Sequence, residues 1–416
     1  MIAQRPPMGF NTWNTFGKDI SEELIRGIAD CFIEKGLKDA GYEYIVIDDC
    51  WSEKERDPKT GKIVADRRKF PSGMKALGDY IHERGLKFGM YSCSGVRTCA
   101  GYPGSFGHEF EDAADFASYG CDLLKYDFCF RPNNVDSKLL YRRMGMALRQ
   151  TGRDIVFSVC TGGMDHPEKW ARSVGGHLYR STLDISDSFD SFKNIALGQA
   201  GNLCYTAPGC FNDLDMLTVG MYGKGNVGDG GCTTEEYKTQ FLLWCLFGTP
   251  LMLGCDPRTL SGELLSLLTN KKLIAVNRDA ECRGAFEASA HPWIGGRKAY
   301  FRFLQDGEYA LGLFNLSDSD GEVPFYLYSA GLGDLSGYGM VFEDLVTGER
   351  SDIRKDYFSA DLPAHGGALY RARLVKLKNS KKRRIYRESL SAYSPDSFGR
   401  TASFDLPAAC GVGLSL

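Results

Sequence analysis

The sequence predicts an α/β fold: a (β/α)8 TIM barrel followed by a small antiparallel β-sandwich domain. Two observations predict it. Up to about Arg283, short apolar runs rich in β-branched residues alternate with stretches of helical periodicity, which is the pattern of parallel strands covered by helices. Beyond Arg283, apolar and polar residues alternate between turns that contain Gly, Asp and Ser, which is typical of antiparallel strands with one buried face.

Eight short apolar runs are candidates for the barrel strands. Each has the length of a buried strand, and the residues between them leave room for a helix. In chain order they are residues 8–13, 43–51, 87–93, 122–130, 154–160, 178–186, 202–208 and 249–256. Since a (β/α)8 barrel needs eight parallel strands with a helix after each, the number matches the fold.

Two of the intervening helices carry clear boundary signals. The first follows the N-cap candidate Ser21, has Glu22 and Glu23 in its first turn and ends at Gly41, as small polar caps and terminal glycines predict. Its predicted apolar face comprises Ile25, Ile28, Ala29, Phe32 and Ile33. A later helix over 233–248 opens with Thr233 and Glu236, which have the spacing of a capping box.

The change of pattern divides the chain into three predicted parts: a catalytic barrel over 1–283, a C-terminal antiparallel β domain over 284–375, and a tail over 376–416. The candidate strands of the β domain are residues 298–304, 308–316, 322–328, 339–345 and 367–374. The tail opens with a basic run and is then rich in Ser, Pro and Gly. We expect it to be solvated and loosely ordered.

Composition and charge exclude several classes of protein. Hydrophobic residues make up 43% and charged residues 25% of the chain, and the net charge is -3. These values are ordinary for a globular protein and lack the basic excess of nucleic-acid or membrane-surface proteins. No apolar run has the length of a transmembrane helix, and the opening residues show no secretory signal. We therefore expect a cytoplasmic protein whose 14 cysteines are mostly reduced.

Charged residues gather where the predicted strands end, which is where TIM-barrel enzymes carry their reactive groups. They are Asp48, Asp49, Lys125, Asp127, Arg180, Asp184, Asp213 and Asp215, with Trp13 and Trp51 beside them. Buried carboxylates are costly unless they are paired or hydrogen-bonded. The set therefore indicates either a metal site, as in Mg²⁺-dependent lyases, or a polyol ligand such as a sugar. The sequence has no HExxH motif and no CxxC pair, so no zinc site is predicted.

Two of these aspartates suit the hydrolysis of a glycosidic bond, which needs one protonated carboxyl and one ionised carboxylate. Lys125 lies two residues from Asp127 on the same predicted strand face, so we expect its charge to lower the pKa of Asp127 and keep it ionised. Asp184 follows Arg180 by four residues. Its proton would be held by the cleft and by repulsion from Asp127.

Simpler structural interpretations remain open for some of these residues. In isolation, Asp48 and Asp49 fit a turn at a strand end, and Asp127 fits a structural ion pair with Lys125.

Further residues are interpreted from their position. We expect Asp213 to be structural, Asp187 to cap the helix that follows it, and Asp215 to contact the ligand. Residues 223–228 match GxGxxG, but they lie in a predicted loop without a βαβ unit, so no dinucleotide site is predicted.

Taken together, the motifs resemble those of the α-galactosidases (melibiases) of glycoside hydrolase family 27, over roughly residues 1–375. The matching segments occur in the family's order. They are PPMGFNTWN (6–14), IDDCW (47–51), TCAGYPGS (98–105), LLKYDFC (123–129), YRSTLDISDSF (179–189), APGCFNDLDML (207–217) and IAVNRD (274–279). An ordered set of this kind is far more specific than any one motif.

The resemblance implies a retaining exo-glycosidase that releases terminal α-galactosyl residues through a covalent glycosyl-enzyme. It makes Asp127 the nucleophile and Asp184 the acid/base. The further residues expected to bind substrate are Trp13, Asp48, Asp49, Trp51, Tyr91, Lys125, Cys129, Thr161, Arg180, Asp215 and Met216. The resemblance also implies a disulfide between Cys99 and Cys129. Neither a metal nor an organic cofactor is expected, and the implied partners are an α-galactoside oligosaccharide or glycoconjugate and further copies of the chain in a homo-oligomer.

The run Cys160-Thr161-Gly162-Gly163 departs from the family, in which relatives usually have Cys-Glu-Trp. The loss of a charged and a bulky residue leaves α-N-acetylgalactosaminidase activity open as an alternative. β-L-Arabinopyranosidase activity is a second alternative, although Asp49 favours a sugar with a C6 hydroxymethyl group. A non-catalytic sugar-binding protein is disfavoured because both catalytic aspartates are present.

Overall fold

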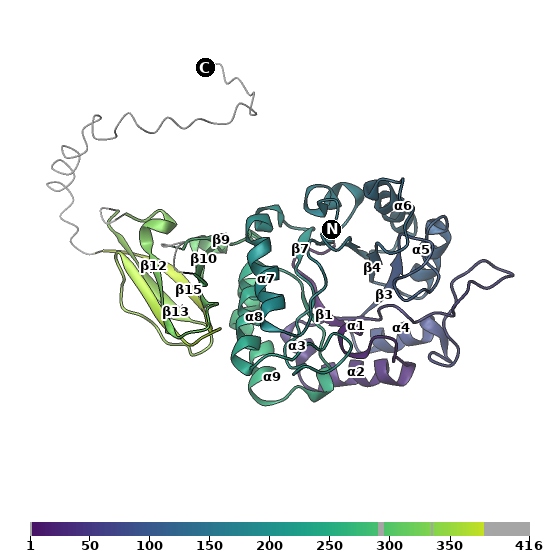
Figure 1. The fold of residues 1–416 in the computed structure, drawn as a ribbon, viewed down its shortest axis with the longest axis horizontal. Coiled ribbons are helices and arrows are strands. Elements are labelled where there is room, and N and C mark those ends of the chain that lie inside the picture. Colours follow the sequence, from purple (N-terminus) through teal and green to yellow (C-terminus); the bar gives the residue numbers. More distant parts are fainter. Residues whose placement is uncertain (1, 290–294, 334–335, 378–416) are drawn as a thin grey trace, which may run out of the picture.

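The computed structural model describes residues 2–289, 295–333 and 336–377, and a barrel of parallel strands forms its larger part (Figure 1). Eight strands form one curled sheet in the order β7-β6-β5-β4-β3-β2-β1-β8. They are β1 (Met8–Asn11), β2 (Tyr44–Val46), β3 (Lys87–Cys93), β4 (Leu123–Asp127), β5 (Val156–Cys160), β6 (Leu178–Arg180), β7 (Phe211–Asp213) and β8 (Leu251–Leu253). The predicted TIM-type fold is confirmed.

The ring closes through a single residue beyond the end of β7. Leu217 forms a parallel bridge with Leu253 of β8. Its N–H donates to the carbonyl oxygen of Met252 (2.7 Å), and its own carbonyl accepts from the N–H of Gly254 (2.9 Å). The seam between β7 and β8 is therefore shorter than the other strand pairings.

Helices surround the barrel, and several of them follow the predicted boundaries. They are α1 (Trp13–Phe16), α2 (Glu22–Glu34), α3 (Leu37–Ala40), α4 (Gly73–Glu83), α5 (Glu109–Ser118), α6 (Ser137–Gln150), α7 (Phe189–Gln199), α8 (Thr234–Phe247), α9 (Gly262–Leu268) and α10 (Lys271–Asn277). Short 3₁₀ helices lie at Pro167–Lys169, Ala171–Val174, Ala200–Tyr205, Pro257–Thr259, Gln305–Gly307 and Leu327–Ala330. Ser21 caps α2 by accepting from the N–H of Leu24 (3.2 Å). Thr233 and Glu236 form the predicted capping box of α8.

No helix within the described residues is long and apolar enough to cross a membrane.

The structure corrects two predicted elements. The strand expected over 202–208 is wrong, because these residues lie in and just after the 3₁₀ helix Ala200–Tyr205. The true strand β7 follows at Phe211–Asp213, and its sequence Phe-Asn-Asp lacks the apolar run expected of a buried strand. The helix expected to run on to Gly41 breaks at Gly36, whose φ of 70° is left-handed. Ile33, assigned to its buried face, is 43% exposed because it lies in the last turn of α2, at the edge of the apolar stripe.

The antiparallel strands form two sheets beside the barrel, with the orders β13-β15-β11-β10-β9 and β12-β14. They are β9 (Phe286–Glu287), β10 (Arg297–Phe303), β11 (Tyr309–Asn315), β12 (Gly321–Tyr326), β13 (Tyr338–Asp344), β14 (Tyr357–Leu362) and β15 (Gly367–Lys376). Two of them, β9 and β14, are absent from the predicted set. Phe301, Phe325 and Phe342 form the core between the two sheets. Of the predicted tail, only residues 376 and 377 lie within the described residues.

Helix α8 joins the two parts of the molecule. From Glu236 to Phe247 every residue except Lys238 is buried, and β11 and β15 pack against it. Figure 1 shows α7 and α8 on the side of the barrel that faces the antiparallel sheets.

Candidate active site

A hollow of about 470 Å³, partly open to solvent, lies at the carboxyl ends of the barrel strands. Most of the polar residues singled out in the sequence line it. The lining residues are Trp13, Asn14, Asp48, Asp49, Tyr91, Cys99, Lys125, Asp127, Cys160, Arg180, Asp184, Ile185, Asp215, Met216 and Val227. The strands therefore bring together charges that are far apart in the sequence.

Asp127, the last residue of β4, is half-buried and borders this hollow. Its Oδ1 accepts from the N–H of Phe128 (2.8 Å), and its Oδ2 accepts from the hydroxyl of Tyr91 (2.9 Å). Burial raises the pKa of Asp127 above its ordinary value, although the charge of Lys125 and these two hydrogen bonds lower it. The expectation that Lys125 lowers the pKa of Asp127 overall is therefore wrong, because desolvation is the larger effect.

Lys125 forms its ion pair with a different strand. Its Nζ lies 2.7 Å from Oδ2 of Asp48 at the end of β2, and the same oxygen accepts from Nδ2 of Asn11 (2.7 Å). Burial lowers the pKa of Lys125, but the charges of Asp48 and Asp127 and the hydrogen bond to Asp48 act together against it, and the pKa is raised above its ordinary value. Lys125 thus remains a cation and compensates the buried charge of Asp48.

Asp49 lines the same hollow, and its carboxylate forms no ion pair with any residue that the structure describes. Its Oδ2 accepts from the N–H of Ala100 (3.0 Å), and its Oδ1 accepts from the N–H of Cys50 (2.7 Å). Burial raises the pKa of Asp49 above its ordinary value. These two N–H donors fix the carboxylate while it borders the hollow.

Arg180, the last residue of β6, binds two carboxylates at once. Its Nη2 lies 2.9 Å from Oδ1 of Asp184 and 2.5 Å from Oδ2 of Asp215. Asp215 is buried and also accepts from the N–H of Ile185 (2.8 Å), whereas the side chain of Asp184 is 88% exposed. Asp184 is therefore the more exposed of the two proposed catalytic carboxyls that line the hollow.

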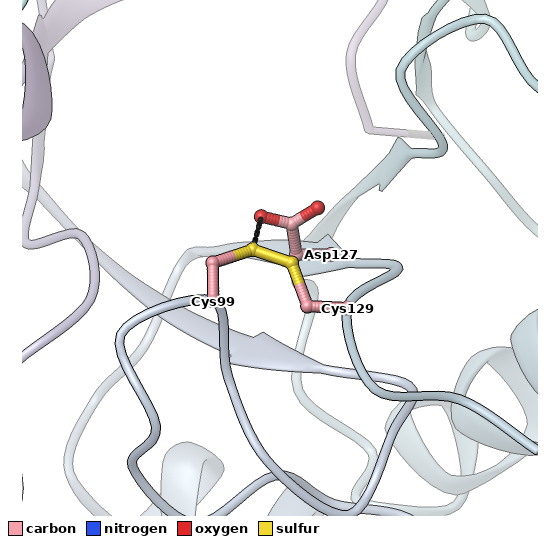
Figure 2. A group of neighbouring side chains, drawn as sticks. All are labelled: Cys99, Asp127 and Cys129. Atoms are coloured by element: carbon pink, nitrogen blue, oxygen red, sulfur yellow. Dashed lines mark hydrogen bonds between the residues drawn. A yellow bond between two sulfur atoms is a disulfide. The ribbon is translucent and has the colours of Figure 1, made fainter.

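A disulfide between Cys99 and Cys129 forms part of the wall beside Asp127, as the family resemblance implied. Figure 2 shows Oδ2 of Asp127 directed at the sulfur of Cys99, 3.6 Å away. The three residues are close enough to hold a metal ion. However, each sulfur is bonded to the other and offers no thiolate, which is the form that binds metals.

Three predicted substrate-binding residues do not line the hollow. Trp51 is buried against Phe116 and donates from Nε1 to the carbonyl oxygen of Tyr91 (2.9 Å). Thr161 is fully buried, and its hydroxyl donates to the carbonyl oxygen of Met164 (2.9 Å). Cys129 lies behind Cys99, which reaches the hollow in its place.

Asp187 is not a helix cap, since Ser188 occupies the N-cap position of α7. Its carboxylate is buried and accepts from the hydroxyl of Tyr237 (2.9 Å) and from the N–H of Gly223 (2.6 Å). Asp213 lines the barrel interior below the hollow. Its Oδ1 accepts from the N–H of Asp215 (2.9 Å), in line with its predicted structural role.

The loop 222–231, which contains the GxGxxG sequence, contributes to the hollow although the sequence did not predict it. Its Val227 lines the hollow. The N–H groups of Asn226 and Val227 donate to the carbonyl oxygens of Thr15 (3.2 Å) and Asn14 (3.1 Å). These contacts hold the loop against α1 at the edge of the hollow. Nothing in the local pattern signals them because the partners lie more than 200 residues earlier.

Comparison with known proteins agrees with this geometry. A family model described as Alpha galactosidase A matches residues 5–279. The Alpha-galactosidase A of Cellvibrio japonicus (strain Ueda107) is 39% identical over 391 residues, which cover 89% of this chain and 92% of that protein.

Two solved structures share the fold over most of both chains. Alpha-galactosidase I from Mortierella vinacea is 31% identical with a TM-score of 0.83, covering 91% of this chain and 99% of that one. The alpha-galactosidase from Saccharomyces cerevisiae with raffinose is 28% identical with a TM-score of 0.78, covering 90% and 98%.

Proposed function

Because this chain belongs to the Alpha galactosidase A family, whose members are glycoside hydrolases, we propose that it hydrolyses terminal α-D-galactosyl residues by a retaining mechanism. One observation carries the mechanistic part. Two carboxyl groups, those of Asp127 and Asp184, line a single hollow in different environments. Asp127 is half-buried and accepts two hydrogen bonds, whereas Asp184 is exposed beside Arg180. Different environments allow two carboxyls to take different roles.

In the first step, Asp127 attacks the anomeric carbon. A bond forms between its carboxylate oxygen and C1, the bond from C1 to the glycosidic oxygen breaks, and Asp184 gives its proton to the departing oxygen. In the second step, Asp184 takes a proton from water, which attacks C1 and releases Asp127. Two inversions at C1 leave the product with the starting configuration. The Tyr91 hydroxyl and the Phe128 N–H hold Asp127 for both steps.

The polar groups around the hollow suit a neutral polyol. Each sugar hydroxyl can donate one hydrogen bond and accept others. The lining holds both donors and acceptors, since Lys125 pairs with Asp48 and Arg180 pairs with Asp215. Trp13 adds an aromatic surface for the apolar face of a sugar ring. An α-galactoside such as raffinose, which is bound in the yeast relative, fits this class of ligand.

One observation favours testing a second substrate, a terminal α-N-acetylgalactosaminyl residue. The segment after β5 contributes Cys160 to the lining, while Thr161 is buried and turned towards Met164. Gly162 and Gly163 follow with positive φ angles of 61° and 79°. This wall therefore carries no acidic side chain and little bulk.

The test is a comparison of hydrolysis rates on p-nitrophenyl α-galactoside, α-N-acetylgalactosaminide and β-L-arabinopyranoside. Asp127→Asn serves as the inactive control, with circular dichroism to show that it folds. We expect the galactoside to be hydrolysed fastest and its turnover to be lost in Asp127→Asn. Proton NMR of the first-formed sugar should show the α anomer. A β anomer would exclude a retaining mechanism. Faster hydrolysis of the α-N-acetylgalactosaminide than of the α-galactoside would change the assigned substrate but not the mechanism.

A further inference from the structure

One histidine of the antiparallel part contacts the barrel beside the candidate active site. His365 lies in the turn before β15, in a left-handed conformation with φ of 61°. Its ring stacks on Phe189, the first residue of α7, with 3.6 Å between ring centroids and 13° between planes. Its carbonyl oxygen accepts from the hydroxyl of Thr239 in α8 (2.7 Å). His365 is thus in contact with two barrel helices at once.

Both ring nitrogens of His365 have carboxylate partners. Nδ1 lies 2.5 Å from Oε1 of Glu236, whose side chain is only 12% exposed, and Nε2 lies 2.9 Å from Oδ1 of Asp318, which is 97% exposed. Oε2 of Glu236 accepts from the N–H of Thr233 (2.7 Å) within the capping box. His365 therefore holds the residue that closes the first turn of α8.

The first turn of α8 anchors the loop 222–231. The hydroxyl of Tyr237, the residue after Glu236, accepts from the N–H of Tyr222 (2.6 Å) and bonds to the buried carboxylate of Asp187. The carbonyl oxygen of Val227, which lines the hollow, accepts from the N–H of Asp187 (3.0 Å). His365 is therefore connected to the loop 222–231 through Glu236, Tyr237 and Asp187.

His365 also contacts the segment that follows Asp184, the proposed acid/base. Phe189, under the His365 ring, lies five residues after Asp184, and Asp187 lies between them. The segment 184–189 is therefore held at its far end by the His365 stack and at its middle by Tyr237.

Asp184 itself is exposed, and Arg180 is its charged partner. Its neighbours are held by the barrel, since Arg180 donates to the carbonyl oxygen of Leu183 (2.9 Å) and Asp215 accepts from the N–H of Ile185 (2.8 Å). The His365 stack fixes the other end of the same segment.

We propose that His365 is a positioning residue for Asp184, through which the antiparallel part of the chain contributes to catalysis. This role rests on the function proposed above for Asp184. Displacing the 184–189 segment weakens protonation of the departing oxygen. Such weakening slows substrates with a poor leaving group and spares those whose leaving group departs without a proton. A residue that only stabilised the contact between the two parts would affect both kinds of substrate equally.

Two variants separate the contacts. His365→Asn removes the ring and its contacts with both carboxylates, and asparagine tolerates the left-handed backbone. His365→Phe keeps a ring over Phe189 and removes the contacts with the carboxylates. The matched control is Asp318→Asn, which removes only the exposed partner. Asp184→Ala gives the signature of a lost acid/base. For each protein, kcat/KM is measured on 2,4-dinitrophenyl α-galactoside and on melibiose, together with Tm.

We expect His365→Asn to lower kcat/KM on melibiose by about tenfold and on the dinitrophenyl substrate by about twofold or less, a fraction of the effect of a lost general acid. His365→Phe should lie between this variant and Asp318→Asn, which should match the unaltered protein. Equal losses on both substrates, or no loss on either, would overturn the proposal. If Asp184→Ala lowers kcat/KM equally on both substrates, Asp184 is not the acid/base, and the role proposed for His365 fails with that assignment.

Discussion

The hydroxyl of Tyr91 lies 2.9 Å from Oδ2 of Asp127 and donates a hydrogen bond to it. Burial and the charge of Asp127 raise the pKa of Tyr91 well above its ordinary value, so the hydroxyl keeps its proton and remains a donor. This bond opposes the effect of burial, which raises the pKa of Asp127. One hydroxyl therefore both orients the proposed nucleophile and favours its ionised form.

Replacing Tyr91 with Phe should move the acidic limb of the pH profile of kcat/KM to higher pH. The hydrogen bond favours ionised Asp127, so its loss raises the pKa of Asp127 further, and a larger fraction is protonated and inactive at acid pH. Tyr126→Phe is the matched control, since its hydroxyl is buried without a hydrogen-bond partner among the described residues. An acidic limb that stays in place, or moves to lower pH, in Tyr91→Phe would contradict this account.

Lys125→Met should destabilise the protein strongly, because it leaves Asp48 buried without its cation. Breaking a buried ion pair from one side costs about 3–5 kcal/mol, and the carboxylate of Asp48 is only 2% exposed. Urea unfolding measures the change. The double variant Lys125→Met with Asp48→Asn should recover part of the loss; if it is as unstable as the sum of the two single variants, the pair is not coupled as described.

Replacing Cys99 and Cys129 together with Ser should lower the free energy of unfolding by about 2–4 kcal/mol, the usual contribution of a disulfide that closes a loop of this order. The two cysteines are 30 residues apart. Dithiothreitol should lower the stability of the unaltered protein towards that of the variant and leave the variant unchanged. A variant as stable as the unaltered protein under oxidising conditions would show that the bridge does not constrain the chain.

His177 should make the protein less stable in acid. Burial lowers the pKa of His177 from 6.5 to about 4. Between pH 6.5 and about pH 4, His177 is protonated in the unfolded chain but not in the folded protein. The free energy of unfolding therefore falls as the pH drops through this range. His177→Asn can still accept from the N–H of Phe157, which donates to Nδ1 of His177 (3.0 Å), but cannot titrate.

Thermal unfolding at about pH 7 and about pH 5 tests this linkage. The decrease in Tm between the two should be smaller in His177→Asn. His166→Asn is the control, because His166 is exposed and its replacement should leave the decrease unchanged. An equal decrease in His177→Asn and the unaltered protein would refute the role of His177.

Features that depend on local pattern could be predicted from the sequence. Ser21 caps α2 and Thr233 opens a capping box, since both signals lie within four residues of their partners. The pairing of charges could not be predicted in this way. Lys125 lies two residues from Asp127, but its Nζ reaches Asp48, 77 residues earlier, because strands β2, β3 and β4 are neighbours in the barrel.

Positions just beyond a strand were the least predictable. Trp51 follows two aspartates that line the hollow, yet it turns into the core between α5 and the barrel. Asp187 has the spacing of a cap, yet its partners Tyr237 and Gly223 come from a distant loop and helix. In both cases the chain has left its strand, so the period of two that fixes side-chain direction no longer applies.

Helix α8 has a consequence for how the molecule can be divided. Nearly all of its surface is covered, on one side by the barrel and on the other by β11 and β15. A fragment that stopped near residue 283 would expose the side chains of this helix that now touch the antiparallel sheet, such as Leu246, which packs against Gly312. Two parts that share one apolar helix should unfold together, so calorimetry should record a single heat-absorption peak.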